Sequence, residues 1–401
     1  MAAKIAVLGG LGLMAEAALH DLARSSEVAE VVAADLHIAR KDAVLAKLPA
    51  AVRRKVKVVS VDLTDTAKAA KALRGTRVLI NAAWYEFNLK AMDLAEALGA
   101  HYLDLGGLYH MTLRQLPRAA AWRKRGLLGV LGCGSTPGIT NMMVQRMAPA
   151  FDSIETVAIY DASHDPSMSE ESFLPPFSIR TMLDEYEMPA PILENGKMIA
   201  APPHSRPSEL EFKAPIGKCV AGTVIHSETA TLPAYLKGKG IKNLCFKIVY
   251  PPSVKAQLAL IVGMGLSKDA PVRVNGASVS PRRLVTNLAL QSAAKAGEST
   301  VEPADFEVLR ILIQGKSGGK PLSLTWDVEM SPKGPLSAGA IGVGWTASIV
   351  AQQILRGALL RESGVCGPED CLDGKDFFRE LTARGTFRVI ERVERPLAVI
   401  G

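Results

Sequence analysis

The sequence lacks the cysteine and histidine patterns that mark disulfide-linked or metal-binding proteins. Its five cysteines are an odd number without a CxxC pair, so neither a disulfide framework nor a zinc cluster is expected. We interpret them as free thiols in a reducing compartment, and Cys133 as a packing residue because no base partner can be assigned to it. His164 and His204 lie without ligand spacing such as HxxxH, and we predict no metal.

Clusters of basic residues and long apolar runs are also missing. Lysines and arginines outnumber acidic residues 47 to 40, but they are scattered and have no aromatic residues between them. A nucleic-acid-binding face is therefore not expected. There is no run of 18 apolar residues to span a membrane. The chain enters a strand pattern at KIAVLGG without a visible targeting segment, which favours the cytoplasm.

What the sequence does have is an alternation of strand-like and helical patterns over its first 140 residues. A chain of 401 residues usually forms more than one domain. Apolar runs such as KIAVLGG and RVLINAAW are typical of strands buried on both faces. The helical stretches between them require right-handed crossovers and a mostly parallel sheet. We predict an α/β fold with a Rossmann-type, doubly wound sheet over residues 1–140.

The pattern changes after residue 140. Fewer helices now separate the strand-like runs, which are SIETVAIYDA, FKIVY, LALIVGMGL, PVRVNG, VLRILIQG and LSLTWDVEM. This clustering predicts a second, α+β domain with a mixed sheet. Residues 336–357 have a helical pattern rich in small residues, and a helix at DFFRELTA and a strand at FRVIERVE follow.

The first predicted strand ends in a glycine turn, GLGLMA, that opens a helix. In such a turn Gly10 permits the tight bend, Gly12 lets the backbone approach a pyrophosphate, and Ala15 allows close helix–strand packing. The helix N-terminus offers unpaired N–H groups and partial positive charge to the phosphates. Asp35 lies 23 residues after Gly12, at the end of the second strand, where a carboxylate binds the ribose 2′-OH.

This context predicts a dinucleotide site. A 2′-phosphate would meet the like charge of Asp35, so NAD is favoured over NADP, although Arg40 and Lys41 soften this preference. The alternative is a glycine turn in an ordinary βα unit with a capping Asp. Asp62 is expected beside the adenine and Asn81 near the cofactor backbone or ribose, unless each is a loop cap. The predicted cofactor-binding residues are Gly10, Gly12, Leu13, Met14, Asp35, Asp62, Asn81 and Ala82.

Several spaced motifs, in order along nearly the whole chain, resemble one known family. They are VLGGLGLMAEAALHDL, NAAWYEFN, YLDLGGLYHMT, GCGSTPGITN and, near the end, VAQQILRG with GVCGPED and FFRELTARG. Together they resemble the saccharopine dehydrogenase superfamily, most closely its lysine 6-dehydrogenase group. The resemblance implies that residues 141–335 form an α+β domain for substrate binding and dimerisation. It also implies that residues 336–401 return to the Rossmann domain.

The resemblance implies NAD-dependent oxidative deamination of an amine or amino acid, and L-lysine, oxidised at its ε-amine, is the first expectation. A saccharopine or carboxynorspermidine dehydrogenase, which oxidises a secondary amine, is the alternative within the class. A non-catalytic, NAD-sensing Rossmann protein is the alternative outside it. The partners implied are a small amine substrate and a second copy of the chain in a homo-oligomer, with neither nucleic acid nor membrane.

Oxidation at a C–N carbon requires a neutral amine, a base and an activated water. Asp104, at the end of the fifth strand, is the leading catalytic candidate, with a turn cap as its alternative. Tyr109 and His110 follow in the same loop, and histidine titrates near neutral pH, but a loop histidine is also common on surfaces. We predict these three residues as catalytic.

We expect substrate-binding residues in separate parts of the chain, around residue 85 and between residues 172 and 232. Tyr85 lies just past a strand end, and Arg180 suits a carboxylate clamp, unless it is a surface residue of a helix. The segment HSETATL departs from the family pattern, which has small glycine-rich residues there. His226 and Glu228 therefore add larger polar groups to the substrate wall, which argues against lysine itself. The pocket should further depend on residues 172–186.

Overall fold

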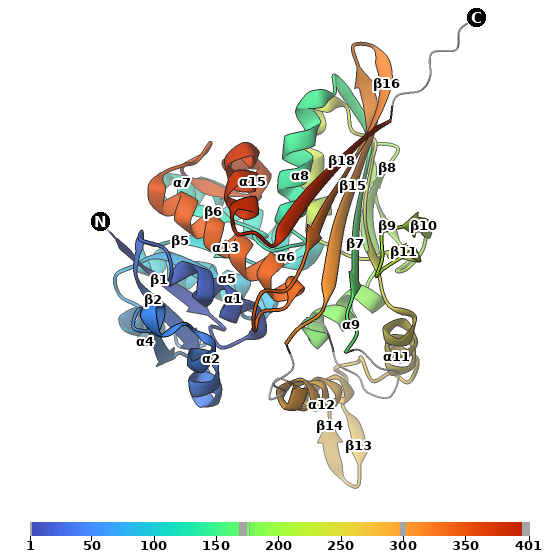
Figure 1. Cartoon of the computed structure of the whole chain (residues 1–401). Coiled ribbons are helices and arrows are strands. Elements are labelled where there is room, and N and C mark those ends of the chain that lie inside the picture. Colours follow the sequence, from blue (N-terminus) through green and yellow to red (C-terminus); the bar gives the residue numbers. More distant parts are fainter. Residues whose placement is uncertain (1, 168–174, 176, 297–301, 395–401) are drawn as a thin grey trace, which may run out of the picture.

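The chain folds around two sheets that face each other across a layer of helices (Figure 1). The computed structural model describes residues 2–167, 175, 177–296 and 302–394. The expected pocket segment 172–186 lies only partly within these residues. Its described part includes α9 (Ile179–Glu187), and its residues 172–174 and 176 lie outside.

The first sheet is the predicted Rossmann-type sheet. Its strand order is β17-β6-β5-β4-β1-β2-β3, and every pairing is parallel. The strands are β1 (Ala3–Leu8), β2 (Val28–Asp35), β3 (Val56–Ser60), β4 (Thr76–Asn81), β5 (His101–Asp104), β6 (Leu128–Val130) and β17 (Gly364–Cys366). Its helices are α1 (Leu13–Leu22), α2 (Lys41–Lys47), α3 (Ala50–Arg53), α4 (Thr66–Ala72), α5 (Asn88–Leu98), α6 (Leu108–Gln115) and α7 (Ala119–Lys124).

The second sheet is mixed, as predicted, because β12 pairs with β7 in parallel and β15 pairs with β7 antiparallel. Its strands are β7 (Ser153–His164), β8 (Ala190–Glu194), β9 (Lys197–Ala201), β10 (Ser208–Glu211), β11 (Lys218–Thr223), β12 (Asn243–Val249), β15 (Phe306–Ser317), β16 (Lys320–Met330) and β18 (Phe387–Glu394). The helices α8 (Ile139–Met147), α9 and α10 (Glu228–Tyr235) belong to this half of the chain.

The run LALIVGMGL is a helix, and its assignment to a strand is wrong. Its first six residues form the second half of α11 (Pro252–Gly263), which begins with a proline at its first turn. Proline suits that position because its missing N–H is one that a helix leaves unpaired anyway. The run also lacks the period-two alternation of a strand, and it contains three leucines and a methionine, which favour helices. With α11 a helix, this run cannot supply an intersubunit strand.

The C-terminal segment joins both sheets. Helix α13 (Ala338–Arg356) packs against α1, β4 and β5 on one side and against β15 and β16 on the other. Gly344 permits this approach, because a Cβ there would lie 2.6 Å from the backbone of α1. Strand β17 extends the first sheet, whereas β18 pairs with β16 in the second. Residues 336–394 therefore return only in part to the Rossmann domain.

Helix α13 is also the one helix of the described residues that is long and apolar enough to cross a membrane. Its most apolar window is 83% buried inside the protein. A helix that is apolar on all sides is buried either in lipid or in the core of a large domain. Because α13 lies between the two sheets, burial in the core of the protein accounts for its apolar composition.

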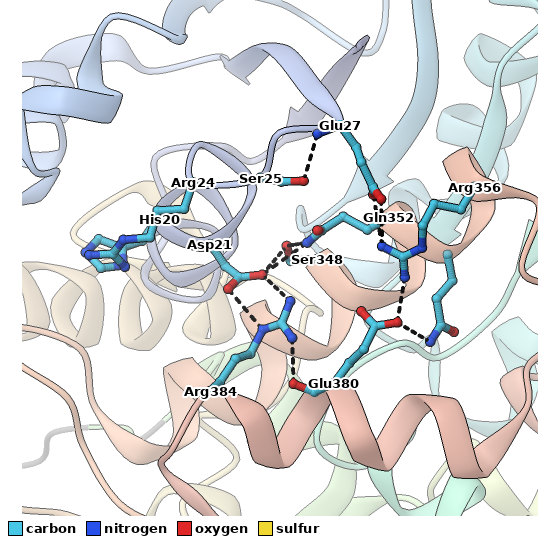
Figure 2. A network of polar contacts seen from close by, with 11 residues as sticks. His20, Asp21, Arg24, Ser25, Glu27, Ser348, Gln352, Arg356, Glu380 and Arg384 are labelled. Carbon is cyan, nitrogen blue, oxygen red and sulfur yellow. Dashed lines mark hydrogen bonds and ion pairs between the residues drawn. The ribbon is translucent and has the colours of Figure 1, made fainter. Parts of the chain in front are cut away.

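A polar network fastens the C-terminal helices to α1 (Figure 2). Asp21 of α1 accepts two hydrogen bonds from Arg384, at 3.0 and 2.8 Å, and one from Ser348 of α13 at 2.6 Å. Arg356, at the end of α13, binds Glu27 and also Glu380 of α15 (Gly374–Ala383). Paired guanidinium–carboxylate bonds fix orientation as well as distance. The nucleotide-binding helix is thereby held against the second half of the chain.

Candidate active site

The glycine turn has the geometry of a phosphate cradle. Gly9 has a φ of +66°, and a Cβ on it would lie 2.8 Å from the backbone nitrogen of Ala83, after β4. A Cβ on Gly10 would lie 2.6 Å from the Cα of Ala33 and would force the turn away from β2. Gly12 is the extended residue before α1, whose first turn leaves backbone N–H groups free for an anion. Leu13 is half exposed there, and Ala15 is buried. These residues fit a dinucleotide pyrophosphate.

Asp35 lies beside this turn with Arg40 close by. The Asp35 carboxylate accepts hydrogen bonds from the backbone N–H groups of Leu11, at 3.2 Å, and His37, at 3.0 Å. Arg40 donates to the carbonyl of Leu11 at 2.7 Å and pairs with Glu16 at 2.9 Å. A negative and a positive group therefore flank the same turn, so the geometry alone leaves both NAD and NADP admissible.

The other predicted cofactor residues differ in how exposed their side chains are and in whether they are already hydrogen-bonded within the protein. Asp62 is exposed beside a hollow of about 270 Å³, whose lining also includes Lys68 and Ala69 of α4. Asn81 is buried, and its amide donates to Asn88 at 2.8 Å and accepts from the backbone of Ala83. Its side chain thus shapes the end of β4. Ala82, in the same turn, is half buried, and a cofactor role for these positions stays a prediction.

Asp104 has the environment of a structural carboxylate, which differs from the expected catalytic one. It is buried and accepts five hydrogen bonds, at 2.7 to 3.1 Å. The donors are the side chains of Asn88, Tyr102 and Gln115 and the backbone N–H groups of Gly106 and Gly132. Burial raises the pKa of Asp104, and the hydrogen bonds lower it; the net shift is upward. The geometry favours the turn-cap alternative: Asp104 fixes the Gly106–Gly107 loop.

Tyr109 and His110 lie on α6, where His110 packs edge-on against the ring of Tyr85. Burial lowers the pKa of His110, and its Nδ1 is buried with no hydrogen-bond partner in the part of the chain that the structure describes. Tyr85 is buried and donates to Asp184 at 2.7 Å. The structure therefore brings Tyr85 and His110 together at the ends of β4 and β5.

Arg180 lies on α9, one turn before Asp184, and its guanidinium stacks 4.6 Å from the ring of Trp84. Arg282 pairs with Asp184 at 2.5 Å from another helix, α12 (Pro281–Ala296). Arg180, the predicted carboxylate clamp, therefore lies against Trp84, which directly precedes Tyr85 in the sequence. Trp84 Nε1 is buried without a partner among the described residues.

The HSETATL segment contributes two buried polar residues, His226 and Glu228, that are in contact with each other. His226 is buried, stacks flat on Phe246 at 3.8 Å and is hydrogen-bonded through Nδ1 to the fully buried Glu228. Its Nε2 lies 3.9 Å from a carboxylate oxygen of Glu185. Burial lowers the pKa of His226, but the neighbouring carboxylates outweigh it, so the net shift is upward. His226 and Glu228, both predicted for the substrate wall, are in direct contact.

Two further acidic residues, Glu185 and Asp161, lie near His226, and Glu307 lies near Asp161; the sequence did not reveal these three. Burial raises the pKa of Glu185 to about 7, that of Asp161 to about 6, and that of Glu307 well above its usual value. Glu185 accepts from Tyr250 at 3.0 Å. Asp161 and Glu307 lie in the long apolar strands β7 and β15. The sequence did contain one signal for Asp161 and Glu307, because each is a carboxylate residue within a long, otherwise apolar strand pattern. We call Asp161, Glu185, His226, Glu228 and Glu307 the acidic cluster.

The acidic cluster adjoins the ends of the Rossmann strands. Ser227 accepts from the backbone N–H of Gly107 at 3.3 Å, directly after β5. Thr136 and Ser135, in the loop after β6, donate to Asp161 at 3.1 Å and Glu307 at 2.6 Å. Ligands of open parallel sheets bind at these carboxyl ends. The described residues contain no group of three or more side chains arranged to hold a metal ion.

Comparisons with known proteins place this site in a family. The Saccharopine dehydrogenase NADP binding domain matches residues 5–130, and the Saccharopine dehydrogenase C-terminal domain matches residues 134–386. A carboxyaminopropylagmatine dehydrogenase from Synechocystis sp. is 22% identical over 307 residues, which are 73% of this chain and 74% of that protein. The solved saccharopine dehydrogenase (L-Glu forming) from Saccharomyces cerevisiae has 15% identity and a TM-score of 0.72, over 98% of this chain and 100% of that one.

Fold, glycine turn and family matches define an oxidoreductase that acts on C–N bonds with a nicotinamide dinucleotide. The chain belongs to the saccharopine dehydrogenase family, whose two domain models together cover most of its length. The resemblance found in the sequence and the predicted two-domain fold are thereby confirmed. The amine substrate and the preference between NAD and NADP belong to the proposal that follows.

Proposed function

We propose that this protein oxidises the C–N bond of a substrate with more than one cationic group, a secondary amine in first place. The observation that carries the proposal is the acidic cluster, in which the carboxylates of Glu228, Glu185 and Asp161 surround His226 next to the Gly106–Gly107 loop and Glu307 lies near Asp161. Buried carboxylates are costly unless a positive charge compensates them. The raised pKa values of Glu185 and Asp161 reflect this cost, and substrate cations placed among these groups would let them ionise, so a polycationic substrate suits the site.

The proposed chemistry starts with loss of a proton from the substrate ammonium. When bound, the dinucleotide supplies the nicotinamide ring that accepts the hydride. Glu228 holds the Nδ1–H of His226, which leaves Nε2 as the basic atom on the side of Glu185. In the proposed sequence Nε2 takes the ammonium proton and releases it to solvent while the hydride leaves the substrate carbon, which gives an iminium. The neutral Nε2 then takes a proton from the water that attacks the iminium and returns it to the nitrogen of the leaving amine. The products are a carbonyl compound, the released amine, the reduced coenzyme and a proton.

The relative from Synechocystis sp. supports a secondary-amine substrate, because its name denotes an agmatine derivative with carboxyl and amino groups. The ε-amine of L-lysine is the second candidate. The guanidinium of Arg180 favours it, because this group lies near Tyr85 and Asp184 and suits a remote carboxylate. The five unpaired cysteines fit a reducing compartment such as the cytoplasm.

The proposal is tested by steady-state formation of reduced coenzyme with three substrates: a carboxyalkylated polyamine, saccharopine and L-lysine. We expect the highest kcat/KM with the polyamine, because it brings more than one cation to the acidic cluster. Saccharopine or lysine as the better substrate would contradict the polycationic assignment. Equal rates with all three would mean that the cluster does not select the substrate.

For the coenzyme we propose NAD ahead of NADP, with Asp35 as the deciding residue. Replacing Asp35 with serine is expected to raise the NADP-to-NAD ratio of kcat/KM by about 10- to 100-fold, because one like charge facing the 2′-phosphate is removed while Arg40 stays beside the turn. The matched control is Asp42→Ser, an exposed carboxylate on α2. A ratio that moves equally in both variants would remove Asp35 from this role.

A further inference from the structure

Two strands share one edge of β12 in the second sheet. β7 pairs along one edge of β12, so β8, which meets β12 at Leu244, and β11, which meets it at Lys247 and Ile248, both lie on the other edge. The sheet forks between these two contacts, and a hollow of about 140 Å³ lies at the fork. One water needs roughly 15 Å³, so a group of several atoms fits. The polar residues that line the hollow are Thr156, Glu194, Arg206, Asn243 and Lys247.

Lys247 brings to this hollow a buried ammonium group that forms no ion pair with any described residue. Lys247 is 8% exposed, and its Nζ donates to the carbonyl of Arg206 and to the hydroxyl of Ser208, both at 2.7 Å. Both acceptors are neutral, and an ammonium has a third N–H group to donate. A buried charge is costly without a counter-charge, and an anion in the hollow would supply one.

Arg206, in the loop before β10, adds a second positive group. Its φ of +54° is left-handed, a conformation that is costly for arginine and is held here by the bond from Lys247 to its carbonyl. The guanidinium binds both carboxylate oxygens of Glu194, but the arginine side chain is 44% exposed, and such an exposed ion pair contributes little to stability. An incoming anion can therefore compete with Glu194 for Arg206. Two cations and one carboxylate leave the hollow positively charged.

The hollow is separate from the acidic cluster, because the two lie on opposite faces of β12. Phe246 stacks on His226, and side chains alternate between the two faces of a strand. Cys245 and Lys247, the neighbours of Phe246, therefore point to the other face. A ligand in the hollow does not occupy the acidic cluster.

We propose that the hollow binds a phosphate group, either as inorganic phosphate or as a phosphate monoester. Such a group carries up to two negative charges, and its oxygens can accept from Lys247 and Arg206, residue types that commonly bind phosphate. Asn243 can donate a further bond, since its Oδ1 already accepts from the backbone N–H of Asn195 at 3.0 Å and its NH₂ group remains. A carboxylate brings only two oxygens and one charge. The proposal does not depend on which amine the enzyme oxidises.

The proposal is tested by calorimetric titration of the full-length protein with inorganic phosphate and with glycerol 3-phosphate. The protein is first saturated with NAD, so that the dinucleotide fills the glycine turn, which also suits an anion. We expect one phosphate site per chain in the wild type. Arg206→Gln should weaken binding at least 10-fold because a cation is lost, and Glu194→Gln should strengthen it about 10-fold because a competing carboxylate is lost.

Two matched controls change a charge away from the hollow and should leave the Kd for phosphate unchanged. Arg273→Gln lies in the exposed hairpin of β13 (Val272–Val274) and β14 (Ala277–Val279), and Glu209→Gln changes an exposed carboxylate of β10. Because the side chains of Arg206 and Glu194 are 44% and 33% exposed, their variants are expected to fold, which far-UV circular dichroism verifies.

Tighter binding of one of the two ligands identifies the source of the phosphate group, and either result supports the site. A wild type that binds neither ligand would overturn the proposal. So would equal affinities in Arg206→Gln, Glu194→Gln and the wild type, which would place the anion elsewhere. Acetate that binds as tightly as phosphate would also overturn it, since the hollow would then not select a phosphate group.

Discussion

Replacing His226 with asparagine is expected to lower kcat by about 100- to 10,000-fold, the usual contribution of a positioned acid or base. His226 holds the basic nitrogen closest to Glu185 and lies beside the loop after β5. Asparagine retains some hydrogen bonding to Glu228 but cannot accept a proton near neutral pH. The matched control is His164→Gln, three residues after Asp161 and on the opposite face of β7, for which we expect at most a small change.

The pH dependence separates a chemical role of His226 from a structural one. As a base, His226 must be unprotonated, so kcat/KM falls as the pH drops through its pKa, which lies above the ordinary 6.5. Glu228→Gln removes a carboxylate that raises this pKa, and the acidic limb should move down by about 1–3 pH units. An acidic limb that stays at the same pH in Glu228→Gln would contradict the assignment of His226 as the base.

Replacing Asp104 with alanine is expected to lower the free energy of unfolding by about 3–5 kcal/mol, the range seen when one partner of a buried charged group is removed. Three side-chain donors and two backbone N–H groups lose their acceptor at once. Asp104→Asn keeps one acceptor oxygen and should lose less. Urea unfolding monitored by circular dichroism measures both differences.

The control for Asp104 is Asp93→Ala, which breaks an exposed ion pair with Arg118 and should cost less than about 1 kcal/mol. The interpretation of Asp104 as a structural residue requires that Asp104→Asn, where it is folded, keep substantial kcat. If Asp104→Asn were as stable as the wild type yet inactive, Asp104 would be catalytic, as the sequence first indicated.

The first domain was predictable because its local signals agree with the fold. Strands buried on both faces, the turn at Gly10 and Gly12, and Asp35 at a strand end each have one physical reading in a parallel sheet. The run LALIVGMGL was misjudged because a short apolar run without alternation does not distinguish a strand from a helix. The return of β18 to the second sheet depends on pairing with β16, a contact between distant residues that no local pattern encodes.

The candidate site was predictable only in part, for a related reason. His226 and Glu228 are two residues apart, and their polarity in an otherwise small and apolar context drew attention to them. Glu185, Asp161 and Glu307 come from three separate elements, and only the tertiary fold brings Glu185 and Asp161 to His226 and Glu307 to Asp161. For Asp104 the sequence leaves both roles open, because a strand-end carboxylate caps a loop as readily as it contacts a substrate, and its catalytic role stays a prediction.

The central claim is that the substrate nitrogen is bound by the acidic cluster and that the C–N bond is oxidised there. Its most direct test is the kcat/KM of the wild type for a polycationic secondary amine compared with its ether analogue, in which oxygen replaces the reacting nitrogen and the other cations remain. The account predicts coenzyme reduction with the amine, none with the ether, and competitive inhibition by the ether. Coenzyme reduction with the ether as well as with the amine, or an ether that does not inhibit competitively, would contradict the account.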